Sequence, residues 1–251
     1  MSFETATGIV IRTVEFSESS LVVTLFTREW GKIAALAKGG RRPKGPFESA
    51  LDLLARCRIA FLRKSADTLD LLTEAKLQQR FRPVGRDLTP WYAAYYAAEL
   101  LGELTDQYDP HPELYDLAEQ FLDAMIQGRS PAGELPRFEL GALRVLGHMP
   151  SLDRCVECGR PIDPSRRVSL GLLDGGVLCG EHRPGRRAVV SVSPGVLAAM
   201  RLAADVNSDN WEKNDLDRRT HGELRGVLNQ YMAHLLGHRP RTHAYLVNLA
   251  P

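Results

Sequence analysis

The sequence predicts an α+β protein in which a small closed β-barrel precedes a helical domain with a metal-binding insert. Five short runs of β-forming residues, separated by turn signals, fill the first 80 residues. Five segments with apolar residues at helical spacing follow. A cluster of Cys and His residues interrupts these helical segments near residues 151–190. The barrel is expected to be a five-stranded OB-fold, and the helical domain to be all-α with a zinc-ribbon-like insert.

Composition excludes several classes of protein. The chain has 251 residues, of which 44% are hydrophobic and 25% charged, as in ordinary globular proteins. No apolar run approaches the roughly 18 residues of a membrane helix, and the N-terminus lacks a signal-peptide pattern. A cytoplasmic location is the default expectation. Four cysteines do not make a disulfide framework in a chain this long, so clustered ones are interpreted as metal ligands.

The barrel domain is expected to span residues 1–80. Its strands are predicted at residues 8–14, 21–27, 31–38, 51–62 and 68–77. The fourth run alternates between apolar residues (Leu53, Ala55, Cys57, Ile59, Phe61) and polar ones (Asp52, Arg56, Arg58). In the fifth run Leu69 and Leu71 are expected inside, with Asp70 and Glu74 outside. An SH3-like barrel or a hairpin-rich sandwich is the structural alternative.

The helical domain is expected in two parts, residues 83–150 and 191–251. Helices are predicted at about residues 91–101, 113–127, 135–147, 194–204 and 216–236. Thr89 and Pro90 have the pattern of an N-cap and a first-turn proline. Trp91 and Tyr95 are expected to face a core. Gly237 is expected to end the last helix.

A metal site is predicted in the insert, residues 151–190. Twenty residues separate the pair Cys155 and Cys158 from the pair Cys179 and His182. This is the C-x2-C…C-x2-H spacing of a zinc ribbon. Four protein ligands leave no open position, so one structural Zn²⁺ ion is expected. A redox-active pair at Cys155 and Cys158 is the alternative, but no thioredoxin-like pattern surrounds it.

A cationic stripe is predicted on the barrel. Residues 1–82 carry 14 Lys/Arg and 9 Asp/Glu, a net charge of +5, whereas residues 83–150 carry 4 and 11, a net charge of −7. The DNA-contacting candidates lie in or after the Gly-rich stretch 31–45, and they are Lys32, Lys38, Arg41, Arg42, Lys44, Arg56 and Arg58. The candidate stacking aromatics, Phe26, Trp30 and Phe47, are few, which favours contact with phosphates. A charged loop without any ligand is the alternative.

Catalytic motifs are not found. The sequence has no Walker loop, no nucleophile elbow and no pair of His residues spaced for a metal on a helix. The carboxylates of residues 83–150 are spread around helices, without the clustering that a nuclease needs. The protein is therefore expected not to be an enzyme. A zinc-ribbon regulatory factor that binds nucleic acid is the alternative function, although no base-reading helix is found.

Three stretches resemble one known family. They are Gly8–Thr27 with Gly31-Lys32 and Ala37–Gly39, then Leu143–Pro150 running into Cys155 and Cys158, and finally Tyr231–Gly237 with Pro240–Thr242. In this order they resemble the bacterial RecO family of recombination mediators, and the resemblance covers essentially the whole chain. The sequence departs from the family pattern at His182, where a Cys is usual, and at Gly45-Pro46, where a Ser is common.

The resemblance implies a role in recombinational DNA repair. RecO-like proteins bind single- and double-stranded DNA, anneal complementary strands and act near the nucleoid. They engage RecR and the acidic tail of the single-stranded DNA-binding protein, and they help RecA to load onto DNA. The tail is expected to bind the helical part, where Arg137 and Arg144, seven residues apart, are candidates for holding its terminal carboxylate; a plain surface role is the alternative.

Overall fold

The computed structural model describes residues 2–42, 45, 47, 50–64, 68–204 and 216–246. The chain divides into two compact units, residues 1–128 and 129–251. Within the described residues, the first unit contains five strands and two α-helices, and the second contains three α-helices, a 3-10 helix and a small sheet. Among the described helices, none has both the length and the apolar character that crossing a bilayer requires.

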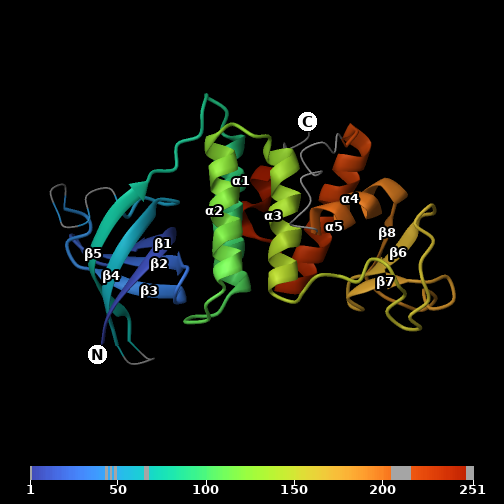
Figure 1. Ribbon diagram of the computed structural model, residues 1–251, viewed down its shortest axis with the longest axis horizontal. Coiled ribbons are helices and arrows are strands. Elements are labelled where there is room, and N and C mark those ends of the chain that lie inside the picture. Colours follow the sequence, from blue (N-terminus) through green and yellow to red (C-terminus); the bar gives the residue numbers. More distant parts are fainter. Residues whose placement is uncertain are drawn as a thin grey trace. The chain divides into compact units, whose positions relative to one another are not determined.

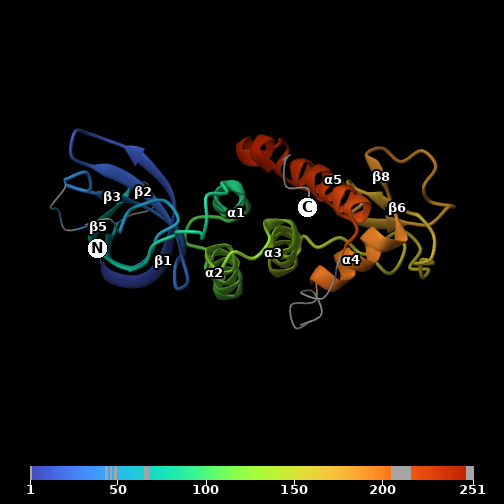
Figure 2. The same cartoon turned by 90° about the horizontal axis from the view of Figure 1, so that it is seen from above.

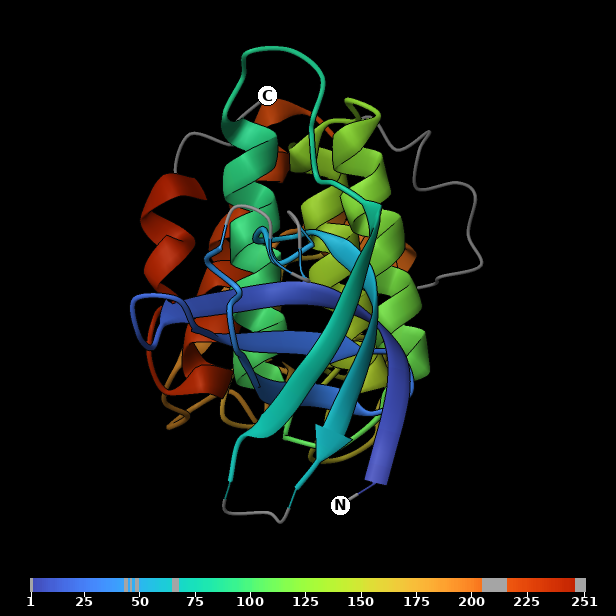
Figure 3. The same ribbon diagram turned by 90° about the vertical axis from the view of Figure 1, so that its left-hand side faces the viewer.

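The first unit contains the predicted barrel. Its strands are β1 (Ser2–Glu15), β2 (Leu21–Thr27), β3 (Gly31–Ala37), β4 (Arg56–Arg63) and β5 (Asp70–Gln79). They close in the order β1-β2-β3-β5-β4, in which β3 and β5 pair in parallel and the other neighbours pair in antiparallel fashion. Figure 3 shows β1, β2 and β3 lying across the steeper β4 and β5. The prediction of an OB-like five-stranded barrel is confirmed.

Strand β1 is twice as long as the sequence pattern indicated, because it pairs with two neighbours. Its first half pairs with β4 and its second half with β2, with a register shift between Val10 and Arg12. Val10 points into the barrel core. Ile9 and Ile11 are buried as well, and Ile11 lies against Gly102 on helix α1 (Thr89–Leu104). Both faces of this segment are therefore apolar.

The predicted start of the fourth strand, at residue 51, is wrong. Residues 51–54 form turns, and β4 begins at Arg56. Leu54 has a positive φ of 67°, a conformation that does not fit an extended strand. The backbone N–H of Leu54 donates to Val10 and that of Val10 to Ala55, so this turn is fastened to β1. Leu51 and Leu54 are buried there, whereas Leu53, expected on the apolar face of the strand, is exposed.

The predicted facing of the fifth strand is wrong for Asp70 and Leu69, although Glu74 is exposed as expected. Asp70, Leu72 and Ala75 face inward, while Leu69 and Leu77 are exposed. Asp70 can be buried because its carboxylate accepts hydrogen bonds from the Tyr108 hydroxyl and from the backbone N–H of Lys64. Burial and the Asp70 charge raise the pKa of Tyr108 to about 12, so its hydroxyl remains a donor.

The segment between helices α1 and α2 (Pro112–Ile126) lies against the start of β3, and its Tyr108 packs on the barrel core. The backbone N–H of Tyr108 donates to the carbonyl of Lys32, and Lys32 forms a bridge with Gln107. A Cβ atom on Gly31 would lie 2.1 Å from the carbonyl oxygen of Asp109, and Gly31 has a φ of +65°. Only glycine fits this contact.

Helices α1 and α2 pack beside the barrel, α1 against β1 and α2 against β2 (Figure 2). Thr89, predicted as the N-cap, is instead the first residue of helix α1, and Leu88 is the N-cap residue. The carboxylate of Asp87 accepts a hydrogen bond from the backbone N–H of Thr89. Trp91 and Tyr95, expected in a core, are only half-buried. They line a pocket that is open to the surface.

The second unit is built from helices and a small sheet (Figure 1). Its helices are α3 (Pro131–Val145), α4 (Pro194–Ala204) and α5 (Arg218–Leu236), followed by the 3-10 helix η2 (Arg241–Leu246). Its strands are β6 (Val168–Gly171), β7 (Gly176–Leu178) and β8 (Val189–Val192), in the order β7-β6-β8. Gly237 ends α5 in a left-handed conformation, as predicted.

Two buried contacts join α5 to α3. Pro136, inside α3, has no N–H to donate to the carbonyl of Ala132, and the His221 Nε2 atom lies 2.9 Å from that oxygen. Arg225 donates two hydrogen bonds of 2.6 Å to the carboxylate of Glu139, which is fully buried. His221 therefore has a packing role between the two helices.

Candidate nucleic-acid interface and metal centre

The basic loop, residues 38–42, follows β3 as a series of turns. The N–H of Gly40 donates to Ala37, and the N–H of Arg42 donates to Gly39. The side chains of Lys38, Arg41 and Arg42 are exposed. Neither Lys38 nor Arg42 has an ion pair within the described part of the chain. The loop thus presents positive charge on a hydrogen-bonded backbone.

The loop is fastened to the turn between β1 and β2. The backbone N–H of Arg41 donates to Ser19, and its guanidinium donates to the carbonyl of Ser17. The same guanidinium lies 3.0 Å from the carboxylate of Glu15. This ion pair is exposed and is therefore weak, so Arg41 can exchange Glu15 for a phosphate at little cost.

An exposed aromatic residue accompanies the loop. Phe16 is 63% exposed at the β1–β2 turn that Arg41 contacts. It is not among the three rings predicted from the sequence. Phe26 and Phe47 are buried, and Trp30 packs edge-on against Phe61. The signal that identifies Phe16 is its position next to a turn, where no strand can bury it.

Lys32 lies away from the loop. Its Nζ donates to the carbonyl of Gly102 at 2.6 Å and to that of Thr105, so it caps the C-terminal end of α1. Burial lowers the pKa of Lys32. Its ammonium group is therefore hydrogen-bonded inside the first unit, to these two carbonyl oxygens.

Arg56 is buried, although the strand pattern placed it outside. Its guanidinium pairs with Glu119 at 2.8 Å and Asp123 at 2.5 Å, both on α2. Burial alone would lower the pKa of Arg56, but the hydrogen bonds donated to Asp123 and Glu119, together with their charges, raise it. The charge of Arg56 is therefore neutralised within the first unit.

Arg58 is exposed on β4, as expected. It lies opposite Lys76 on β5 and Thr7 on β1, so two cations share this face of the barrel. The Lys76 ammonium is 3.1 Å from the carboxylate of Glu74. Lys44, the remaining candidate, lies outside the described residues.

The four predicted metal ligands come together in the second unit. The ligand atoms of Cys155, Cys158, Cys179 and His182 all lie within 4.8 Å of one another. Sulfur atoms bound to a tetrahedral zinc at about 2.3 Å are separated by about 3.8 Å, and the Sγ atoms of Cys158 and Cys179 are 3.9 Å apart. The Nδ1 atom of His182 lies 3.1 Å and 4.0 Å from the sulfurs of Cys179 and Cys155. The donor set thus fits a tetrahedral ion.

Backbone donors favour the thiolate form of two of these ligands. Burial alone would raise the pKa of Cys155, but N–H groups of the two turns, first that of Cys179, lower it. Burial would likewise raise the pKa of Cys179, but hydrogen bonds from the backbone N–H groups of His182 and Glu181 lower it. Because metals bind thiolates, both effects favour metal binding.

Two ion pairs link the ligand-bearing turns. Glu157, in the first turn, pairs with Arg186 beyond the second, at 2.6 Å. Glu181, in the second turn, pairs with Arg160 beyond the first, at 2.9 Å. These carboxylate partners give the two arginines a local role in joining the turns.

Arg137 and Arg144 both lie on α3. Arg137 is half-buried, and Arg144 is exposed in the last turn of the helix. Neither makes an ion pair with another described residue. Their helical spacing places them on one face, as expected.

Comparison with known proteins gives one consistent result. A family model for the N-terminal part of recombination protein O matches residues 1–81, and a model for its C-terminal part matches residues 85–244. The chain belongs to the RecO family. It is 42% identical over 263 aligned positions to the DNA repair protein RecO of Rhodopirellula baltica, with 95% of this chain and 97% of the relative covered.

More distant RecO relatives match over the same length. The DNA repair protein RecO of Anaeromyxobacter sp. strain K is 34% identical, with 98% of this chain and 96% of the relative covered. That of Myxococcus xanthus is 32% identical, with 92% of each covered. The similarity therefore extends through the barrel, the helices and the metal cluster, and it identifies the chain as a RecO DNA repair and recombination protein.

Proposed function

We propose that this RecO chain is a non-catalytic recombination mediator that binds single- and double-stranded DNA and anneals complementary strands. With RecR, it would help RecA to load onto DNA covered by single-stranded DNA-binding protein, at the nucleoid in the cytoplasm. Membership of the RecO family is the observation that carries this proposal. The exposed cations of the basic loop agree with it.

DNA binding is assigned to the barrel domain, residues 1–80. Lys38, Arg41 and Arg42 would contact the phosphates, with Arg58 extending the positive surface and Lys44 as a further candidate. Lys32 and Arg56, included in the sequence-based set, are left out because their charged groups already contact carbonyl and carboxylate oxygens. Contacts to phosphates make binding dependent on salt and nearly independent of sequence.

The metal cluster would hold one structural Zn²⁺ ion in the insert, residues 151–190. Three thiolates and one imidazole suit zinc, and they fill its four positions, so no site for a water or a substrate remains. The ion would supply the cross-link that so short a sheet needs. Metal analysis of the purified protein should give about one zinc per chain.

Partner binding is assigned to the helical domain, residues 83–150 and 191–251. Arg137 and Arg144 would attract the acidic tail of the single-stranded DNA-binding protein, because both are free of ion pairs within the described residues. A carboxylate pairs well with guanidinium groups. The exposed position of Arg144 suits a ligand that arrives from solution.

An annealing assay tests the proposal. Two complementary oligonucleotides should anneal faster when the protein is added, in the absence of any nucleotide. When the strands are coated with single-stranded DNA-binding protein, acceleration should depend on the acidic tail of that protein. A strict requirement for ATP would contradict the mediator function, and equal acceleration with and without the tail would remove tail binding from it.

A further inference from the structure

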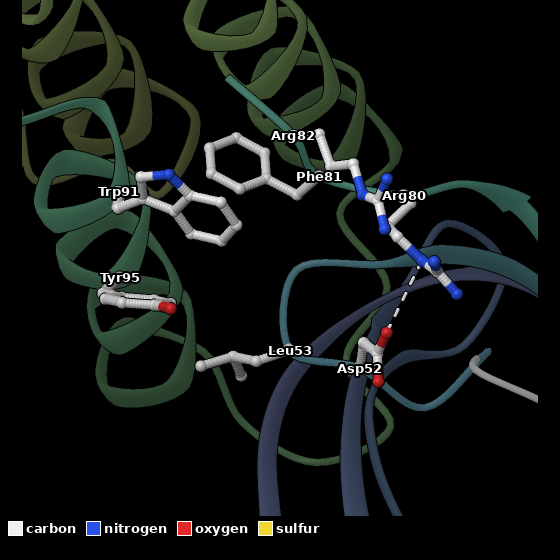
Figure 4. A pocket seen from close by; sticks show the side chains of 7 residues that line it. All are labelled: Asp52, Leu53, Arg80, Phe81, Arg82, Trp91 and Tyr95. Atoms are coloured by element: carbon white, nitrogen blue, oxygen red, sulfur yellow. Dashed lines mark ion pairs between the residues drawn. The ribbon is translucent and has the colours of Figure 1, made fainter. Parts of the chain in front are cut away.

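A pocket of the first unit has no part in the interface described so far. It encloses about 360 Å³ and is lined by Asp52, Leu53, Arg80, Phe81, Arg82, Trp91 and Tyr95. In Figure 4 the rings of Trp91 and Tyr95, from α1, border the space opposite Leu53 and Asp52. Its size is at the lower end of the pockets that hold small organic groups, about 300–1,000 Å³.

Three aromatic rings form one side of this pocket. The centroids of Phe81 and Trp91 lie 5.0 Å apart with perpendicular rings, and those of Trp91 and Tyr95 lie 6.1 Å apart. Phe81 is buried and fixes the orientation of Trp91. Trp91 and Tyr95 keep part of their surface open to the pocket. The planes of the Trp91 and Tyr95 rings are tilted by 49° to each other, so each ring offers its own apolar face to a planar ligand.

Two arginines stand at the opposite side of the opening. Arg82 is exposed, and Arg80 lies 3.6 Å from the carboxylate of Asp52, a long separation for an ion pair. The buried Nε atom of Arg80 has no hydrogen-bond partner among the described residues. The lining therefore carries two positive charges and one negative charge, which suits a ligand with an anionic group next to an aromatic one.

We propose that this pocket holds one unpaired nucleobase of a single strand, stacked on the ring of Trp91 with Tyr95 against its edge, while Arg80 and Arg82 contact the adjoining phosphates. The proposal rests on the DNA-binding function proposed above. It adds a site at which a base, as well as the backbone, is held, and it explains why aromatic rings are left accessible on α1. Base stacking of this kind tolerates any sequence.

The test uses the full-length protein with Trp30 and Trp211 replaced by Phe, so that Trp91 is the remaining tryptophan. Binding of a labelled oligonucleotide and quenching of the tryptophan emission are measured in one titration. A second oligonucleotide has abasic sites in place of the bases. The expected result is quenching of Trp91 by the ordinary strand, and weaker binding of the abasic strand.

Two further variants complete the test. Tyr95→Ala should weaken binding of the ordinary strand by roughly tenfold and leave binding of the abasic strand unchanged. Tyr92→Ala, which changes a half-buried tyrosine of the same helix outside the pocket, should leave both unchanged. If the strands bind equally well and Trp91 is not quenched, the base pocket is refuted while DNA binding stands. If neither strand binds, the proposed function fails and the pocket with it.

Discussion

The basic loop of the first unit and the metal cluster of the second are held in place in different ways. The loop depends on contacts with a turn about twenty residues away, through the Arg41 backbone and side chain. The cluster is made by two short turns whose ligands lie three residues apart, Cys155 with Cys158 and Cys179 with His182. One site is assembled by tertiary structure, and the other by local geometry.

Because of this difference, the role of a metal ligand can be predicted from its sequence spacing, whereas the role of a charged residue depends on its surroundings in the fold. A ligand pair on one turn points the same way whatever surrounds it, and so its spacing is sufficient. A cation on a strand is free or neutralised according to what packs over it. Lys32 and Arg56 are both covered by the helices of the first unit, whereas Lys38 and Arg42 are not.

The largest effect is expected from metal removal, which tests whether the cluster needs its ion. Structural zinc contributes on the order of 10 kcal/mol of binding free energy at neutral pH. Cys155→Ser should abolish stoichiometric zinc and lower the unfolding temperature of the second unit. Cys57→Ala, at the cysteine buried in the barrel, is the control and should retain the metal. Unchanged zinc content in Cys155→Ser would contradict the assigned ligands.

A smaller but still large effect is expected at the buried ion pair between α3 and α5. Glu139→Ala leaves the guanidinium of Arg225 buried without its carboxylate, which should lower the free energy of unfolding by about 3–5 kcal/mol. Chemical denaturation measures this loss. The double variant Glu139→Leu with Arg225→Met should recover most of the stability, because no charge then remains buried. An equally unstable double variant would show that the pair acts by more than charge.

Lys32→Met tests whether Lys32 stabilises the fold or contacts DNA. It removes the ammonium group that caps α1 and leaves the carbonyls of Gly102 and Thr105 unpaired, which should cost about 1–3 kcal/mol in unfolding free energy. Affinity for single-stranded DNA should not change under conditions where the variant is folded. A loss of affinity without a loss of stability would return Lys32 to the interface.

The smallest effect is expected at the exposed pair between Arg28 and Asp116, whose atoms are 2.8 Å apart. The hydrogen bond from Arg28 holds the pKa of Asp116 below its ordinary value of 3.8. The stabilisation is therefore complete above this value and is lost as the pH falls through the lower, folded-state pKa. The unfolding temperatures of wild type and Asp116→Asn should differ slightly at neutral pH and converge in acid; a constant difference would exclude this pair as the cause.

Much of the fold could be predicted from the sequence because its signals are local. Strands β2 and β3, the ends of α2 and α5, and the metal ligands follow from alternation, proline positions and spacing. The errors arose where long-range contacts override the pattern. Asp70 faces inward because Tyr108 donates to it, and Arg56 is buried because α2 supplies two carboxylates. Neither the partner of Asp70 nor those of Arg56 can be predicted from a local sequence pattern.

The candidate site was predicted in part for the same reason. The position of the basic loop follows from its Gly and Lys/Arg content, but which of its cations are accessible depends on packing. The rings of Phe16, Trp91 and Tyr95 became candidates only when their exposure was known. Their sequence neighbourhoods resemble those of ordinary turn and core residues.

The most direct test of the DNA-binding assignment is the affinity for a single-stranded oligonucleotide as a function of salt. The wild type is compared with a variant in which Lys38, Arg41 and Arg42 are each replaced by Glu. We expect weaker binding by the variant and a plot of log affinity against log salt whose slope is smaller by about 2, since each lost phosphate contact removes about 0.7. Identical affinity and slope in a folded variant would contradict the assignment of the basic loop as the DNA-binding surface.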